Sequence, residues 1–83
     1  MTRVLIYKAA AQRALRGMDR ADTARILRGL EEFAVSGRGD LKALKGALKG
    51  RYRLRTGKWR IIFHFEQPDR IVVSDIADRG HAY

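Results

Sequence analysis

Cysteine is absent from this sequence of 83 residues, and proline occurs once. Without thiols the chain has no disulfide, no cysteine nucleophile and no thiolate metal site. Apolar runs such as Val4-Leu5-Ile6 are far shorter than the roughly 18–20 residues that a membrane-spanning helix needs. The beginning of the sequence also lacks the long apolar stretch of a signal peptide. These absences predict a soluble, cytoplasmic protein that acts without a membrane.

Acidic and metal-ligating residues are scarce as well. Nine Asp and Glu stand against 18 Lys and Arg, and the two histidines, His64 and His81, are seventeen positions apart. The sequence contains no HExxH motif, no glycine-rich phosphate loop and no acidic pair at metal-ligand spacing. We therefore expect no metal site and no cofactor.

Positive charge is what the sequence has in excess. The formal net charge is +9, and the isoelectric point is near 10.9. Such an excess on a small chain usually marks a polyanionic or acidic partner. Charge alone leaves nucleic acid, an acidic protein and an anionic membrane surface as alternatives. With 46% hydrophobic residues, the chain can form one packed domain spanning residues 1–83.

The N-terminal half predicts one strand followed by two helices. Residues 3–7 are mostly β-branched, aliphatic or aromatic, as in a strand, and residues 8–18 place apolar side chains at helical spacing. Asp19 is expected to cap the second helix, which ends at the Ser-Gly-Arg-Gly run of residues 36–39. The apolar stripe of that helix comprises Ile26, Leu27, Leu30, Phe33 and Ala34.

The C-terminal half predicts an antiparallel meander. Strands over residues 51–56, 59–66 and 71–77 are joined by turns at residues 56–58 and 67–70. The expected fold is therefore α+β, in the order β-α-α-β-β-β, with a helical hairpin packed on a mostly antiparallel four-stranded sheet. The position of the first strand in that sheet stays open. Residues 41–50 are expected to connect the helices to the meander, with leucines on the core and lysines outward.

The candidate chemistry lies in the cations and phenols. Arg53 and Arg55 point the same way along one strand, whereas the face of Arg60 depends on the register of the hairpin. The C-terminal tail adds Arg79, His81 and Tyr83. Guanidinium groups bind phosphate and stabilise charge that develops on it, and RNA carries its own nucleophile in the 2′-hydroxyl. A metal-free ribonuclease therefore needs only phosphate clamps, a base and an acid, and histidine can be either.

One pattern in these segments is more specific. It runs through two Leu-Lys-Gly units at 44–50, Tyr-Arg-Leu-Arg at 52–55, a turn glycine, Trp-Arg-Ile-Ile-Phe at 59–63 and Arg-Gly-His-Ala-Tyr at 79–83. This pattern resembles RelE-type toxins of the RelE/ParE superfamily, and the resemblance covers nearly the whole chain. It implies the toxin of a bacterial type II toxin–antitoxin pair, an mRNA interferase that enters the ribosomal A site, cuts mRNA and arrests growth. It also implies an acidic cognate antitoxin that neutralises the toxin in a hetero-oligomeric complex.

The resemblance also assigns roles by position. The catalytic residues that it implies are Arg53, Arg55, Arg60, Arg79, His81 and Tyr83. The RNA-binding residues are Lys42, Lys45, Lys49 and Arg51. Some relatives have lysine at positions 53 and 55, and arginine is a poor general base. Proton transfer is therefore expected of His81, with Tyr83 stacking on or hydrogen bonding near the scissile nucleotide, although the sequence leaves the identity of the base open.

Two other functions compete with this prediction. A ParE-like toxin would share the fold and the charge but would inhibit DNA gyrase by binding, without nuclease activity. A basic RNA- or DNA-binding module without toxicity is the third alternative. The combination of the strand arginines with a tail ending in tyrosine favours the nuclease, because a pure binding protein does not need those groups together.

Overall fold

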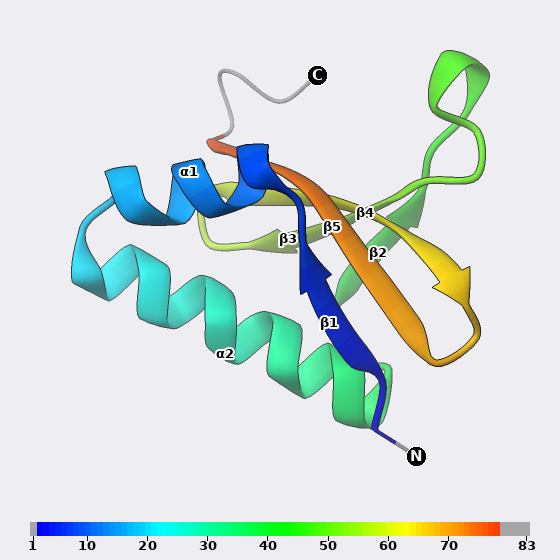
Figure 1. Ribbon diagram of the computed structural model, residues 1–83, viewed down its shortest axis with the longest axis horizontal. Coiled ribbons are helices and arrows are strands. Elements are labelled where there is room, and N and C mark those ends of the chain that lie inside the picture. The colour runs from blue at the N-terminus through cyan, green and yellow to red at the C-terminus, as the bar shows by residue number, and fades with distance from the viewer. Residues whose placement is uncertain (1, 79–83) are drawn as a thin grey trace.

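The chain forms a sheet with two helices on one of its faces (Figure 1). The computed structural model describes residues 2–78. The elements are β1 (Val4–Tyr7), α1 (Ala9–Gly17), α2 (Arg20–Ser36), β2 (Asp40–Ala43), the 3₁₀ turn η1 (Gly46–Leu48), β3 (Tyr52–Thr56), β4 (Trp59–Gln67) and β5 (Arg70–Asp78). None of the helices within residues 2–78 is long and apolar enough to cross a membrane.

The ends of α2 are set by local interactions that the sequence predicts. The side chain of Asp19 accepts a hydrogen bond of 2.8 Å from the backbone N–H of Asp22, which satisfies a free donor in the first turn. At the other end, Gly37 adopts a φ of 75°, and its N–H donates to the carbonyl of Phe33 at 2.8 Å. A left-handed residue at this position favours glycine, so the helix ends here.

The sheet has the strand order β1-β5-β4-β3-β2. The meander β3-β4-β5 is antiparallel, as predicted, and β1 pairs in parallel with β5 at one edge. The expected sheet of four strands is wrong by one strand, because residues 40–43 pair with β3 as the antiparallel edge strand β2. No alternating apolar pattern marks β2, since it is only four residues long and every one of them is exposed.

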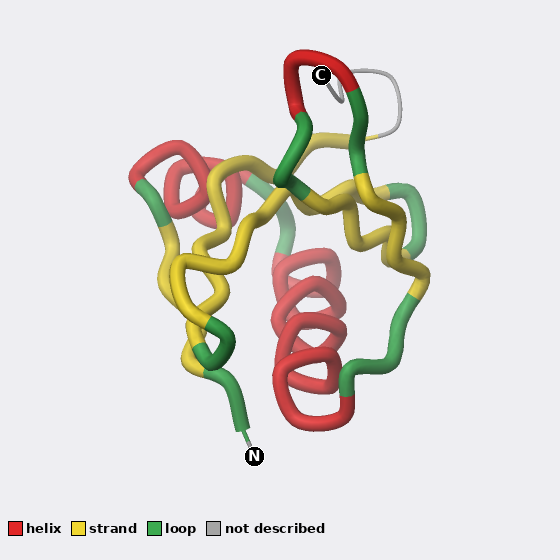
Figure 2. Tube along the Cα trace, turned by 90° about the vertical axis from the view of Figure 1, so that its right-hand side faces the viewer, coloured by secondary structure: helices red, strands yellow, loops and turns green. Residues whose placement is uncertain are grey.

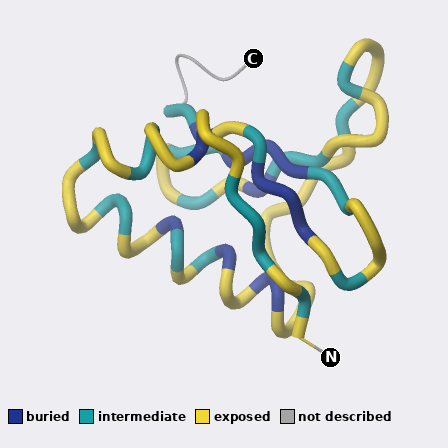
Figure 3. The backbone as a smooth tube through the Cα atoms, viewed as in Figure 1, coloured by how far each residue is buried: buried dark blue, intermediate teal, exposed yellow. Residues whose placement is uncertain are grey.

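The main core lies between the helices and the near face of the sheet. Ile26, Leu30 and Phe33 of α2 pack with Ile61 and Phe63 of β4, and all five are nearly or fully inaccessible to solvent. Figure 3 shows the buried positions recurring along α2 and in the central strands, while the outer surface of α2 is exposed. The predicted burial of these positions is confirmed. Leu27, predicted on the same stripe, is only half-buried.

The connection between β2 and β3 extends away from the helices as a loop around η1 (Figure 1). It is closed by a backbone hydrogen bond of 3.0 Å from Leu44 N–H to the carbonyl of Arg51. The expectation that all its leucines reach the core is wrong for Leu41, which is exposed, whereas Leu44 and Leu48 are half-buried. Lys45 and Lys49 are exposed, as expected.

Candidate active site on the arginine face

Strand register places the predicted strand arginines together. Arg53 and Arg55 lie on the β3 face opposite to that of the core residue Leu54, and Arg60 is the direct cross-strand partner of Arg55. Cross-strand partners point to the same side of a sheet, so the three arginines share the face away from the helices. Lys42 joins them from β2, directly opposite Arg53. We call this surface the arginine face, comprising Lys42, Arg53, Arg55 and Arg60.

The Arg55–Arg60 pair is electrostatically unfavourable in the free protein. Like charges directly opposite each other in an antiparallel pair are destabilising. Within residues 2–78 the ion pairs are Arg53–Asp40 and Arg70–Glu66, so neither Arg55 nor Arg60 forms an ion pair among these residues, although Asp40 stands opposite Arg55 on its other side. An anion bound between the two guanidinium groups would relieve the repulsion. The arrangement therefore favours binding of phosphate over a purely structural role.

Arg53 differs from its neighbours in being largely covered. Its side chain is only 12% exposed, and its Nη2 donates to Oδ1 of Asp40 at 3.2 Å. Asp40 is the cross-strand partner of Arg55, so it reaches Arg53 diagonally across the β2–β3 pair. Asp40 is not among the site residues predicted from the sequence. The sequence feature that could have indicated it is the two-residue spacing of Asp40 and Lys42. This spacing puts both side chains on one face, and so an acid among the cations, only if residues 40–43 form a strand.

Two hydrogen-bond donors on this face are buried without partners. The Nε atoms of Arg53 and Arg60 are inaccessible to solvent, and neither has an acceptor among residues 2–78. Buried polar groups are nearly always hydrogen bonded, and an unpaired one calls for an explanation. Guanidinium N–H groups are strong donors to phosphate oxygens. Both unpaired donors belong to residues that the sequence predicts as phosphate clamps.

The loop around η1 borders the arginine face and adds further cations. Two cavities of about 330 Å³ each adjoin this loop. One is lined by Ala10, Leu48, Arg51, Ile62, Ser74 and Asp75, and the other by Lys42, Ala43, Leu44, Lys45 and Leu48. Three of the four residues predicted to bind RNA therefore line a cavity here, and Lys49 lies exposed on the same loop. Figure 2 shows this loop on the opposite side of the strands from α2, whereas Ala10 of α1 reaches the first cavity.

The floor of the first cavity is shaped by a bulge in β5. Ile62 pairs with Asp75 while Phe63 pairs with Val73, so Ser74 is an extra residue in β5. The hydroxyl of Ser74 donates to the carbonyl of Ile62 at 3.1 Å, which fixes the bulge. Ile62 is buried on the arginine-face side of the sheet, outside the cluster that packs against the helices.

The remaining predicted residues cannot be placed. Arg79, His81 and Tyr83 lie outside the described residues 2–78. His64, the other histidine, is half-exposed on β4 opposite Val72. Within residues 2–78 no group of three His, Asp or Glu side chains is arranged to hold a metal ion.

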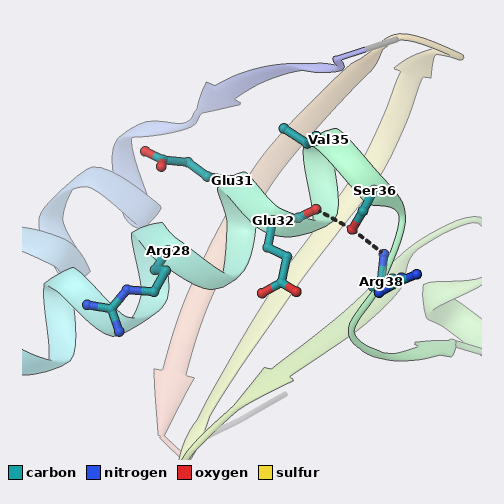
Figure 4. A pocket seen from close by; sticks show the side chains of 6 residues that line it. All are labelled: Arg28, Glu31, Glu32, Val35, Ser36 and Arg38. Atoms are coloured by element: carbon teal, nitrogen blue, oxygen red, sulfur yellow. Dashed lines mark hydrogen bonds between the residues drawn. The ribbon is translucent and has the colours of Figure 1, made fainter.

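A larger cavity lies elsewhere and differs in character. It has a volume of about 400 Å³ and lies on the last turns of α2, lined by Arg28, Glu31, Glu32, Val35, Ser36 and Arg38 (Figure 4). There the hydroxyl of Ser36 donates to the carbonyl of Glu32 at 2.7 Å and accepts from the backbone N–H of Arg38 at 3.1 Å. These bonds complete the helix end, and the lining combines two arginines with two glutamates, so this cavity lacks the excess of positive charge on the arginine face.

Several solved structures with the same architecture come from toxin–antitoxin complexes. The Mycobacterium tuberculosis RelBE2 toxin–antitoxin complex contains a chain that matches with a TM-score of 0.84 at 16% identity, covering 95% of this chain and all of that one. For the RelE–RelB complex of the archaeon Pyrococcus horikoshii the TM-score is 0.77 at 24% identity, covering 99% and 100%. For the YoeB dimer of Staphylococcus aureus it is 0.76 at 16% identity, with full coverage of both chains. The chain has the RelE-type toxin fold.

The likeness to RelE-type toxins concerns the fold, because the sequences have diverged. No family model matches the chain, and no curated protein matches it. The resemblance predicted from the Leu-Lys-Gly, Tyr-Arg-Leu-Arg and Trp-Arg-Ile-Ile-Phe segments therefore agrees with the three-dimensional comparison. Of those segments, the last two form β3 and the first half of β4, where the RelE-type fold here carries the arginine face.

Proposed function

We propose that this chain is the toxin of a type II toxin–antitoxin pair and cleaves mRNA on the ribosome. The observation that carries the proposal is the arginine face itself, where Arg55 and Arg60 stand directly opposite each other and Arg53 lies on the same side of the sheet. These groups suit a phosphate that gains negative charge during reaction. The shared fold with RelE and YoeB complexes supports the same assignment. Such an enzyme acts in the cytoplasm, where ribosomes present the substrate.

The proposed reaction uses the RNA as its own nucleophile. The 2′-oxygen attacks the adjacent phosphorus while the bond from phosphorus to the 5′-oxygen breaks, so the products carry a 2′,3′-cyclic phosphate and a 5′-hydroxyl. The strand arginines and Arg79 hold the phosphate and offset its developing charge. His81 is proposed to take part in proton transfer, and Tyr83 to stack on or hydrogen bond near the scissile nucleotide. No metal or cofactor enters the proposed reaction.

The proposed partner is an acidic antitoxin that covers the basic surface. A net charge of +9 steers an anionic polypeptide toward the toxin, and the association rate falls as salt rises. The complex structures with this fold are consistent with such a partner. An association rate indifferent to ionic strength would contradict an electrostatically guided complex.

The deciding experiment induces the chain without an antitoxin and maps mRNA 5′ ends in the arrested cells, with gyrase supercoiling assayed in parallel. Cleavage within translated reading frames, giving 5′-hydroxyl ends, is expected. In vitro, an mRNA with a 2′-deoxy group at the cut position should resist cleavage on programmed ribosomes. Intact mRNA combined with loss of supercoiling would replace this proposal by gyrase inhibition, and cleavage of the 2′-deoxy substrate would overturn the mechanism.

A further inference from the structure

Asp40 places a carboxylate among the cations of the arginine face, which are Lys42, Arg53, Arg55 and Arg60. It stands directly opposite Arg55, and its carboxylate oxygen lies 3.2 Å from Nη2 of Arg53. A carboxylate here repels RNA, so its presence weakens the binding that the arginine face promotes. Because Asp40 weakens RNA binding, we expect a local reason for its position, namely a compensating role in its contacts with neighbouring residues.

The local reason is the crowding of cations around Arg53. Lys42 is directly opposite Arg53, and Arg55 lies two residues further along the same strand face. Without Asp40, no carboxylate among residues 2–78 would lie within ion-pair distance of the Arg53 guanidinium. Repulsion from its neighbours would then favour rotamers that point Arg53 out toward solvent.

The Arg53–Asp40 contact also differs from an ordinary surface ion pair. Exposed pairs typically contribute little, because both side chains are mobile and solvated. Here the Arg53 side chain is only 12% exposed, whereas that of Asp40 is 60% exposed. The hydrogen bond therefore immobilises a largely covered guanidinium through one nitrogen, while its Nε remains without an acceptor.

We propose that Asp40 is a positioning residue that holds the Arg53 guanidinium on the arginine face, in the orientation that binds the RNA phosphate. This inference rests on the proposed function and deepens it by adding a residue outside the set that the resemblance implies. Asp40 acts through Arg53 and does not itself contact the reacting atoms.

The first test measures the order of Arg53 without using activity. In uniformly ¹⁵N-labelled protein, the Nε–H signal of Arg53, assigned by comparison with Arg53→Lys, should be protected from exchange with water. Asp40→Ala should abolish that protection, and Asp40→Asn, which retains an oxygen acceptor, should preserve part of it. Glu66→Ala is the matched control, because it removes the other ion pair, Arg70–Glu66 at 3.6 Å. Unchanged protection of Arg53 in Asp40→Ala overturns the inference.

The second test measures single-turnover cleavage on programmed ribosomes. Asp40→Ala should slow the saturated rate about 10-fold or more, since small misplacements of a catalytic group cost up to about 100-fold. Asp40→Asn should recover part of the rate, and Glu66→Ala should match the wild type. In the Arg53→Gln background, Asp40→Ala should not lower the saturated rate further, because Asp40 acts only through Arg53 and the Arg53 guanidinium is already gone. Additive losses in that background would show that Asp40 acts independently of Arg53.

The two tests separate failure of this inference from failure of the proposed function. If Asp40→Ala only lowers the half-saturating ribosome concentration and leaves the rate unchanged, Asp40 merely repels RNA and the inference is wrong. If the wild-type protein cuts no RNA, the proposed function fails, and the Nε–H measurement alone then decides whether Asp40 positions Arg53.

Discussion

Arg60 is the residue on which the candidate site most depends. It faces the like-charged Arg55 across the β3–β4 pair, and its Nε is one of the three buried side-chain donors without a partner among residues 2–78. Because Arg55 repels it, replacing Arg60 should raise the free energy of unfolding of the free protein. Replacing an arginine with a structural role would instead lower that free energy. Function and stability should therefore respond to its loss in opposite directions.

Replacing Arg60 with alanine should abolish toxicity while leaving the fold intact. Loss of one contact that stabilises transition-state charge commonly costs about 10²–10³ in rate. Growth after induction, together with circular dichroism and the melting temperature of the purified variant, measures both effects. Arg28→Ala, on the outer surface of α2, is the control and should stay toxic. A folded and fully toxic Arg60→Ala protein would mean that the nuclease site is elsewhere.

Tyr7 provides a test of the structure at high pH. Burial, and secondarily the negative charge of Glu31, raise the pKa of the Tyr7 hydroxyl above its ordinary value of 10.0. The folded protein therefore holds this proton more tightly than the unfolded chain. The resulting contribution to stability is fully present below about pH 10 and is lost as the pH rises through the raised pKa.

Denaturant unfolding of the wild type at pH 7 and near pH 10.5 should show a fall in the free energy of unfolding. Tyr7→Phe should show a smaller fall over the same interval, because it has no hydroxyl to ionise. Glu31→Gln should show an intermediate fall, since only the secondary cause is removed. Equal losses in all three proteins would contradict the packing of Tyr7 against the core and its proximity to Glu31.

At the scale of elements, the loop around η1 is the part that sequence patterns described least well. The residues just before it form β2, which brings Asp40 and Lys42 to the sheet, and the loop itself carries exposed lysines beside the neighbouring cavities. The leucines at 44 and 48 are half-buried and hold the loop against the sheet side that bears the arginines. The loop therefore presents charge without contributing to the main core.

Neutralising Lys45 and Lys49 together by glutamine should weaken ribosome binding without changing the saturated rate of cleavage. Each phosphate contact on a single strand contributes about 0.7 to the slope of log affinity against log salt, so that slope should decrease by about 1.4. The double variant Arg13→Gln and Arg16→Gln removes the same charge from exposed positions of α1 and serves as the control. Identical salt slopes for the two double variants would show that the loop acts only through net charge.

At the scale of the whole molecule, the two layers are joined through an aromatic cluster centred on Phe63. Its ring is fully buried, with ring centroids 5.3 Å from Phe33 of α2 and 5.7 Å and 5.6 Å from Tyr52 and Phe65 in the sheet. Because β4 presents Phe63 on one face and its arginine on the other, packing of this cluster also sets the orientation of the arginine face.

Phe63→Ala should destabilise the protein by roughly 3–5 kcal/mol, the range for truncating a buried phenylalanine. The free energy of unfolding from denaturant titration measures this change. Val35→Ala on the exposed surface of α2, where the side chain is 61% exposed, should change it by less than about 0.5 kcal/mol. A loss below 1 kcal/mol for Phe63→Ala would contradict the core described here.

Local sequence was sufficient for the elements whose signals lie within a few residues. Periodicity or backbone chemistry predicts four features that the structure confirms: the cap at Asp19, the helix end at Gly37, the apolar stripe of α2, and the alternation of side chains in β3 and β4. The pattern of Arg53 and Arg55 on one strand face also required only the two-residue period of a strand. From these the α+β class and the shared face of Arg53 and Arg55 followed, whereas the catalytic roles came from the resemblance to RelE-type toxins.

Tertiary structure decided what depends on partners far apart in the chain. Four such pairings join distant segments: the parallel pairing of β1 with β5, the pairing of β2 with β3, the register that puts Arg60 opposite Arg55, and the contact of Asp40 with Arg53. A shift of one residue in the β3–β4 register would have moved Arg60 to the core side, and no local pattern forbids that shift. Only the packing of the aromatic cluster against α2, with hydrogen bonds along every strand pair, selects the arrangement that assembles the arginine face.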